Sequence, residues 1–135
     1  AVAEVPGAAA AIARLRAAGV KVALNTGFDR TLTTHLLDAL GWREIADAVV
    51  CGDDVAAGRP APDLIRAAMA ATDVRDAAAV ANVGDTALDL RAGAAAGVGW
   101  NIGVWSGAHD RATLEAAPHT HLCASVADVP AILGA

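Results

Sequence analysis

The chain has 135 residues, the size of one domain that can bury a hydrophobic core of its own. Its net charge of −5 at pH 7 argues against binding to nucleic acids or to anionic membranes, because both partners require basic patches. Aromatic residues make up only 3% of the chain, so we expect a core of Leu, Val and Ile with closely packed Ala.

The two cysteines, Cys51 and Cys123, lie far apart and form no Cys-x-x-Cys motif. Lone cysteines in an ordinary domain are typical of a reducing compartment, so we predict a cytoplasmic location. We see no signal peptide, and the longest uncharged stretch, Ala92 to Ala108, contains several glycines that argue against a membrane span. Because the chain begins Ala-Val-Ala without Met, we expect it to be processed, truncated or part of something longer.

Apolar spacing, with Gly and Pro as boundaries, predicts alternating helices and strands along the chain. The first half of the chain is predicted to form a helix over Gly7–Ala18 ended by Gly19, a strand over Val20–Asn25, a helix over Asp29–Leu40 ended by Gly41, a strand over Ala48–Cys51 and a helix from Pro62 to about Ala71. The second half is predicted to form a strand over Ala78–Val83, a helix over Ala87–Ala96 ended by Gly97, a strand over Trp100–Val104, a short helix over Asp110–Ala116, a strand over His121–Cys123 and a helical turn over Ala127–Leu133.

This alternation predicts an α/β fold, a Rossmann-like doubly wound parallel sheet with helices on both faces. No linker or internal repeat divides the chain, so we expect one domain over residues 1–135. In such folds ligands bind beyond the carboxyl ends of the strands. The residues that follow each predicted strand are therefore the candidates for a site.

Two polar segments follow the first two predicted strands. After the first strand, NTGFDR offers Asn25, the hydroxyl of Thr26 and the flexible backbone of Gly27 before a helix start, a place that suits an anion. The alternative is a plain helix cap. After the second strand, Arg59 lies between Gly58 and Pro60, and its guanidinium suits phosphate oxygens. The alternative is a solvated surface arginine.

The third strand is followed by VGDTALDL, in which Asp85 and Asp89 lie four residues apart. Carboxylates near a helix start suit Mg²⁺, which takes few carboxylates and keeps several waters. The alternative is that Asp85 only caps the helix and Asp89 faces solvent.

Taken together, these segments resemble the haloacid dehalogenase (HAD) superfamily, and the resemblance covers nearly all of the chain. Thr26 matches its second motif, Arg59 its third, and Gly84-Asp85-Thr86 with Asp89 its fourth. The stretches LNTGF, GRPAPDLI, VGDTALDLRAGAAAG, GVWSGAHD and PHTH look most like the phosphonatase-like (phosphonoacetaldehyde hydrolase-like) branch.

The resemblance implies a Mg²⁺-dependent hydrolase of a small phosphate ester or phosphonate. In that family an aspartate of an Asp-x-Asp motif attacks phosphorus and forms an aspartyl-phosphoryl intermediate. Thr26 and Arg59, with Asn25 and Gly27, would hold the phosphoryl oxygens, and Asp85 and Asp89 would hold the metal. This is electrostatic catalysis by groups arranged in advance.

The sequence departs from the family pattern because it contains no Asp-x-Asp motif and no helical cap. It looks like the C-terminal part of the core domain, without the central strand that lies between Val20–Asn25 and Ala78–Val83 in the family. We expect those two strand edges to pair directly, to recruit another chain as a homo-oligomer or a missing N-terminal half, or to aggregate. We also expect the isolated chain to have no phosphatase turnover.

Two other functions stay open at this point. The chain could be a non-catalytic fragment or degenerate relative that binds phosphate or a partner. It could also be another doubly wound protein such as a nucleotide binder, although NTGFDR is not the glycine-rich loop that this requires. The pair His119 and His121 lacks a third metal ligand and is interpreted as polar surface.

Overall fold

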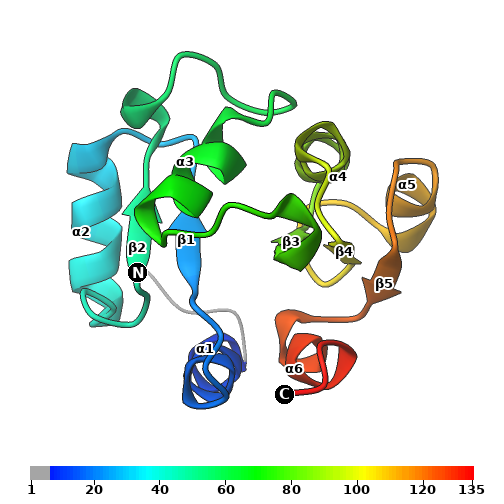
Figure 1. Ribbon diagram of the computed structural model, residues 1–135, viewed down its shortest axis with the longest axis horizontal. Helices are drawn as coiled ribbons and strands as arrows, with labels where there is room; N and C mark the ends of the chain where they lie inside the picture. Colours follow the sequence, from blue (N-terminus) through cyan, green and yellow to red (C-terminus); the bar gives the residue numbers. More distant parts are fainter. Residues whose placement is uncertain (1–6) are drawn as a thin grey trace.

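The computed structural model describes residues 7–135 and has a layer of parallel strands between two layers of helices (Figure 1). The α-helices are α1 (Ala8–Ala17), α2 (Arg30–Leu40), α3 (Asp63–Ala71), α4 (Ala87–Ala96), α5 (Arg111–Glu115) and α6 (Val129–Ile132). The strands are β1 (Ala23–Asn25), β2 (Ala48–Val50), β3 (Ala81–Gly84), β4 (Trp100–Val104) and β5 (His121–Cys123). Short 3₁₀ turns are η1 (Gly52–Asp54), η2 (Ala77–Ala79) and η3 (Val126–Asp128).

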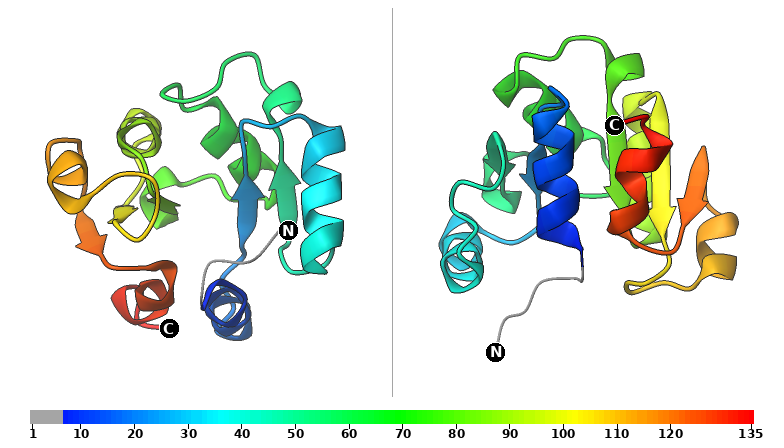
Figure 2. Two further views of the ribbon diagram at one scale, coloured as in Figure 1. Left: turned by 180° about the vertical axis from the view of Figure 1, so that it is seen from behind. Right: turned by 90° about the horizontal axis from the view of Figure 1, so that it is seen from below.

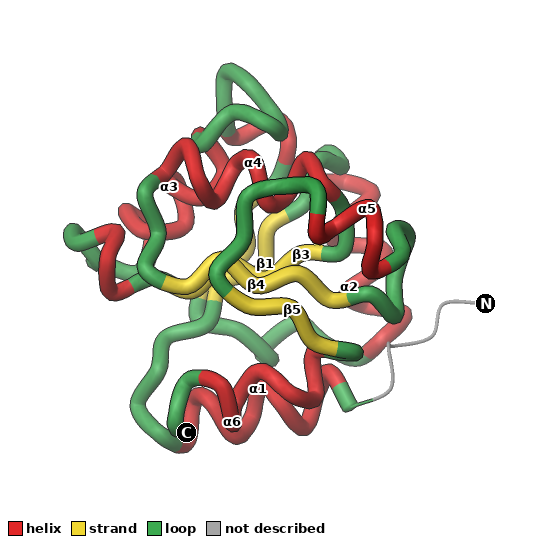
Figure 3. The backbone as a smooth tube through the Cα atoms, turned by 90° about the vertical axis from the view of Figure 1, so that its right-hand side faces the viewer, coloured by secondary structure: helices red, strands yellow, loops and turns green. Residues whose placement is uncertain are grey.

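The strands form two separate parallel sheets, one of β1 and β2 and one in the order β3-β4-β5. In the first sheet Ala23 pairs with Ala48, and in the second Ala81 pairs with Trp100 and Ile102 with His121. Strand β3 is the next strand beyond β1 in the layer (Figures 1 and 3), yet no ladder joins the two within residues 7–135. Of the three outcomes expected for these edges, direct pairing is therefore not formed in the described chain.

Helices cover both faces of the strand layer, as the sequence predicts for a doubly wound fold (Figures 2 and 3). Helices α1 and α6 lie on one face, where Leu15 packs with Ile102, Val104 and Val129. Helices α3, α4 and α5 lie on the other face, where Leu90 and Leu114 form a second buried cluster. Each cluster removes apolar surface from water, and this is the main term that stabilises the layers.

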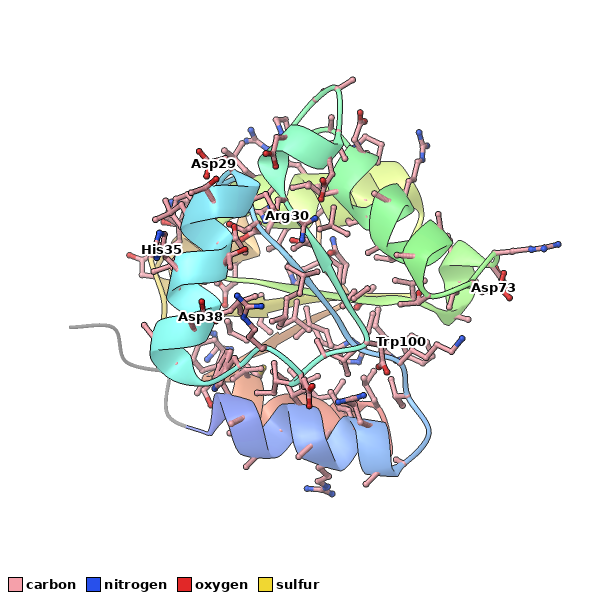
Figure 4. All side chains as sticks on the ribbon, turned by 90° about the vertical axis from the view of Figure 1, so that its left-hand side faces the viewer. Asp29, Arg30, His35, Asp38, Asp73 and Trp100 are labelled. Atoms are coloured by element: carbon pink, nitrogen blue, oxygen red, sulfur yellow. The ribbon has the colours of Figure 1, made fainter. Side chains whose placement is uncertain are left out.

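Three predicted helices, α1, α2 and α4, end within two residues of the glycine that marks their end in the sequence, and α3 begins directly after Pro62. Asp29 caps the start of α2 by accepting a hydrogen bond from the Leu32 N–H, and it lies at the upper end of that helix in Figure 4. The glycines after α2 and α4, Gly41 and Gly97, have φ of 71° and 74°, a backbone conformation that favours glycine.

Two strands are shorter than the apolar runs predict, for reasons that involve an aspartate in each case. The predicted strand Val20–Asn25 pairs only from Ala23, because the carboxylate of Asp47 takes the Val22 N–H at 2.7 Å. The predicted strand Ala78–Val83 begins at Ala81, because Asp76 accepts from the Ala78 N–H at 3.0 Å and caps a 3₁₀ turn there. The other strand boundaries agree to within one residue.

The fold also describes the surroundings of the two cysteines and the lengths of the helices. Cys51 and Cys123 are free and buried, and burial, with the nearby charge of Asp128, raises the pKa of the Cys123 thiol. Within residues 7–135 no helix is long and apolar enough to cross a membrane. The cytoplasmic location stays a prediction.

Candidate active site

The candidate residues all follow the carboxyl ends of strands, where a parallel sheet presents its loops. Asn25 is the last residue of β1, Arg59 lies in the connection from β2 to α3, and Asp85 follows β3 directly. Asp89 lies in the first turn of α4. The fold thus gathers at one edge the segments that the sequence selects.

The loop after β1 is held by its backbone. The Thr26 N–H donates to the Val50 carbonyl at 3.0 Å, and the Thr26 hydroxyl accepts from the Phe28 N–H at 3.2 Å. Thr26 therefore does not cap α2, a role that Asp29 fills. A Cβ on Gly52 would lie 2.2 Å from the Gly27 carbonyl oxygen, so this loop and the loop after β2 approach backbone to backbone.

Arg59 connects the end of β1 to the first turn of α4 through its guanidinium. Its Nε lies 2.8 Å from Asp89 Oδ1, and its Nη2 donates to Asn25 Oδ1 at 2.8 Å and to the Asn25 carbonyl at 3.3 Å. The Arg59 side chain is 28% exposed and that of Asp89 only 11%. A fixed, partly buried guanidinium is not the solvated surface arginine of the alternative interpretation.

Asp89 is buried and has both carboxylate oxygens engaged. While Oδ1 pairs with Arg59, Oδ2 accepts from the N–H groups of Asp85 and Thr86 at 3.2 and 3.1 Å. Thr86 caps α4 and accepts from the Asp89 N–H, which completes a capping box. A Cβ on Gly84 would lie 2.2 Å from Asp89 Cβ, so the glycine makes room for this carboxylate. Asp89 thus does not face solvent.

Asp85 is half-buried and is not the cap of α4. Its Oδ2 accepts from the Ala108 N–H at 3.1 Å, and within residues 7–135 no hydrogen-bond donor reaches its Oδ1. The structure therefore brings Asn25, Arg59 and Asp89 into direct contact. It gives the Asp85 and Thr26 side chains other neighbours, the β4–α5 loop and Phe28.

Two amide side chains behind α4, one buried and one partly buried, are not among the residues that the sequence selects. Asn82 Nδ2 donates to the Asp89 carbonyl at 2.9 Å and to Asn101 Oδ1 at 3.1 Å. Asn101 Nδ2 donates to the Leu90 carbonyl at 2.8 Å. These bonds fix the first turn of α4 on β3 and β4. A polar residue inside each of two apolar strands is the signal that could have found them.

The residues present fit a Mg²⁺ site only in part. Asp85 offers one oxygen that accepts no hydrogen bond from the part of the chain described, whereas both oxygens of Asp89 are engaged. Mg²⁺ accepts such a donor set, since it is commonly held by one or two carboxylates, waters and substrate phosphate. Residues 7–135 contain no group of three or more His, Cys, Asp or Glu side chains that could hold a metal, and His119 and His121 are exposed.

The chain is similar to known proteins over most of its length. The haloacid dehalogenase-like hydrolase family matches residues 2–97. The chain is 36% identical to a phosphonoacetaldehyde hydrolase of Syntrophobacter fumaroxidans over 83% of this chain and 40% of that protein. It is 39% identical to a phosphoglycolate phosphatase of Cupriavidus necator over 69% of this chain and 40% of that protein.

Solved structures give the same result. A phosphonoacetaldehyde hydrolase-like protein from Oleispira antarctica superposes with a TM-score of 0.87 at 25% identity, over 96% of this chain and 55% of that one. CbbY from Rhodobacter sphaeroides, solved in complex with phosphate, gives a TM-score of 0.78 at 31% identity, over 92% and 55% of the two chains. The chain spans about two fifths of the length of the curated relatives. It belongs to the haloacid dehalogenase-like hydrolase family and is similar to its phosphonoacetaldehyde hydrolases.

Proposed function

We propose that this chain supplies the phosphate-binding and metal-binding edge of a Mg²⁺-dependent hydrolase that cleaves a phosphate ester or a phosphonate. The observation that carries the proposal is Arg59, whose guanidinium is held between Asn25 at the end of β1 and Asp89 at the start of α4. It places guanidinium N–H donors at the carboxyl ends of parallel strands, where a phosphoryl group would need them, although the Asp89 carboxylate offsets its charge.

The phosphoryl oxygens would be held by Arg59, Thr26, Asn25 and the backbone at Gly27. A guanidinium has five N–H donors, and the contacts to Asp89 and Asn25 use only some of them. The remaining donors would bind phosphoryl oxygens. Because these donors are positioned before the reaction, they stabilise the charge of the transition state with little reorganisation.

The metal would be held by Asp85 and Asp89. Asp85 contributes the oxygen that faces no donor in the described chain, and Asp89 becomes a direct ligand only when its ion pair with Arg59 opens. Bound Mg²⁺ would neutralise charge on the transferring phosphoryl group. Asp89 otherwise acts through the two groups it orients, the Arg59 guanidinium and the Asp85 backbone.

The nucleophile is the part that this sequence does not contain. An aspartyl-phosphoryl intermediate requires a reactive aspartate, and the Asp-x-Asp motif is absent from all 135 residues. We propose that a further segment supplies it, on a strand that pairs with the open edges of β1 and β3. The same edges favour association of the isolated chain with itself, which sedimentation velocity would detect as a dimer or larger species.

Phosphate release is the test of this function. The isolated chain with Mg²⁺ should release no phosphate from phosphonoacetaldehyde or phosphoglycolate, the substrates that the relatives' names suggest. A longer polypeptide containing this sequence and an Asp-x-Asp strand should release phosphate from one of them. The substitutions Arg59→Met and Asp85→Asn should each lower that rate at least about 100-fold, the typical cost of a lost electrostatic contact to the transition state. Turnover by the isolated chain would contradict the proposal.

A second candidate is a non-catalytic module that binds phosphate or a partner chain. The observation that favours it is the closed contact between Arg59 and Asp89, which is satisfied without any ligand. This candidate predicts that inorganic phosphate binds the chain while every longer polypeptide stays inactive with both substrates.

A further inference from the structure

The loop between β4 and α5, residues 105–110, contacts the segment that carries Asp85 in three places. The Ala108 N–H donates to Asp85 Oδ2 at 3.1 Å, and the His109 N–H donates to the Asp85 carbonyl at 3.1 Å. In return, the Ala87 N–H donates to His109 Nδ1 at 3.0 Å. The main chain and the side chain of Asp85 are therefore both held by the loop that follows a different strand, β4.

The His109 ring satisfies a helix donor that the helix itself cannot satisfy. Ala87 is the first residue of α4, and the first four N–H groups of a helix have no partner within it. Thr86 accepts from the Asp89 N–H, and His109 accepts from the Ala87 N–H. Because Nδ1 is the acceptor in this bond, it carries no proton and is not free to bind a metal.

The approach of this loop depends on a glycine. A Cβ built on Gly107 would lie 2.2 Å from Asp85 Oδ2 and 2.4 Å from Asp85 Cβ. Such distances exclude any side chain unless the loop or the carboxylate moves. The sequence therefore has a residue without a side chain where the loop comes closest to Asp85.

The base of the loop is fixed to β5 and α5. The Trp105 and Ser106 N–H groups donate to the Cys123 and Ala124 carbonyls at 3.1 and 2.9 Å, which continues the pairing beyond the strands. The Arg111 guanidinium lies over the Trp105 ring, 5.0 Å from its centroid. With its base held in this way, the tip at Gly107–His109 has little freedom to leave Asp85.

From these contacts we infer that His109 is a positioning residue for Asp85. Its ring accepts a hydrogen bond from the start of α4 and so holds the β4–α5 loop against this helix. In this position the Ala108 N–H donates to Asp85 Oδ2, and Asp85 Oδ1 stays available to a cation. The inference rests on the proposed function in one respect, the assignment of Asp85 as a metal ligand. A partner that orients a metal ligand typically changes metal affinity by about 10–100-fold when it is removed.

The test uses the whole chain with Mg²⁺ alone as the probe. The amide signals of residues 84–87 are followed by NMR during a Mg²⁺ titration, and hydrogen exchange of the Ala87 amide is measured without metal. Three variants are compared. His109→Leu removes the acceptor, His109→Asn places an oxygen acceptor near the position of Nδ1, and His35→Leu changes an exposed histidine of α2 that points away from the body (Figure 4).

We expect His109→Leu to weaken Mg²⁺ binding at least about 10-fold and to speed exchange of the Ala87 amide. His109→Asn should restore both to near the wild-type values, and His35→Leu should change neither. A purely structural role would lower stability in His109→Leu without changing the Mg²⁺ affinity of the folded protein, and that result would overturn the inference.

The same experiment separates this inference from the proposed function. If the wild-type chain and Asp85→Asn respond equally to Mg²⁺, the assignment of Asp85 is wrong, whatever the hydrogen exchange of Ala87 shows. If the wild-type chain binds Mg²⁺ through Asp85 and His109→Leu binds it equally well, only the role of His109 is wrong.

Discussion

Replacing Arg59 by methionine should lower the free energy of unfolding by about 2 kcal/mol. The change leaves the Asp89 carboxylate in a site where its side chain is 11% exposed, without the cation that lies 2.8 Å away. Removing one partner of a fully buried pair costs about 3–5 kcal/mol, and an exposed pair is worth about 0–1 kcal/mol. The cost here lies between these values, because Arg59 is 28% exposed and Asp89 Oδ2 keeps its backbone donors.

Urea unfolding followed by the fluorescence of the three tryptophans measures this cost. The matched control is Arg75→Met, because Arg75 and Asp73 form a 4.0 Å pair with side chains 93% and 84% exposed. The control should change stability by less than about 0.5 kcal/mol. Adding Asp89→Asn to Arg59→Met should recover part of the loss, since no charge is then left unpaired. If Arg59→Met costs no more than Arg75→Met, the pair is a surface contact and the argument for a fixed guanidinium is wrong.

Three further results are expected. Gly93→Ala should destabilise the chain by about 1–3 kcal/mol in the same urea assay, because the new Cβ would lie 2.0 Å from Asn101 Oδ1. Asp47→Asn should weaken the chain at neutral pH but not at strongly acid pH. The hydrogen bond from the Val22 N–H lowers the pKa of Asp47 in the folded state. The ionised Asp47 carboxylate therefore stabilises the fold at pH values above its pKa in the unfolded chain, and this stabilisation is lost as the pH falls through its pKa in the folded chain. Equal losses of stability in Asp47→Asn at both pH values would contradict this. The Cys123 thiol, whose pKa is raised by burial, should react with iodoacetamide far more slowly in the native chain than in urea, as mass spectrometry can show.

Helices could be predicted from the sequence more accurately than strands. Gly41 and Gly97 mark helix ends because they adopt positive φ, a property of the residue itself. Strand ends depend instead on which partner takes each N–H. At Val22 that partner is Asp47, 25 residues away, and an apolar run cannot reveal it.

The same distinction applies to the candidate site. The motif residues could be placed at the strand ends, because their position follows from the order of elements along the chain. Other features of the site depend on contacts that form only in the folded chain. Both carboxylate oxygens of Asp89 are engaged in such contacts, and Asp85 is held by the β4–α5 loop. His109 directly precedes Asp110, the cap of α5, yet its ring accepts a hydrogen bond from the Ala87 N–H of a different helix, α4.

The packing of α1 has a consequence for how the chain unfolds. Each sheet is built from one continuous stretch of sequence, residues 23–50 and 81–123, so each can form from local contacts. Helix α1 precedes the first sheet, yet Leu15 packs with Ile102, Val104 and Val129 beside the second. Along the chain, the first sheet therefore lies between two parts that pack against each other, namely α1 and the elements around the second sheet. In native-state hydrogen exchange, the amides of α1, β4 and α6 should therefore exchange together through one opening of the structure. The amides of β1 and β2 should exchange through a separate opening.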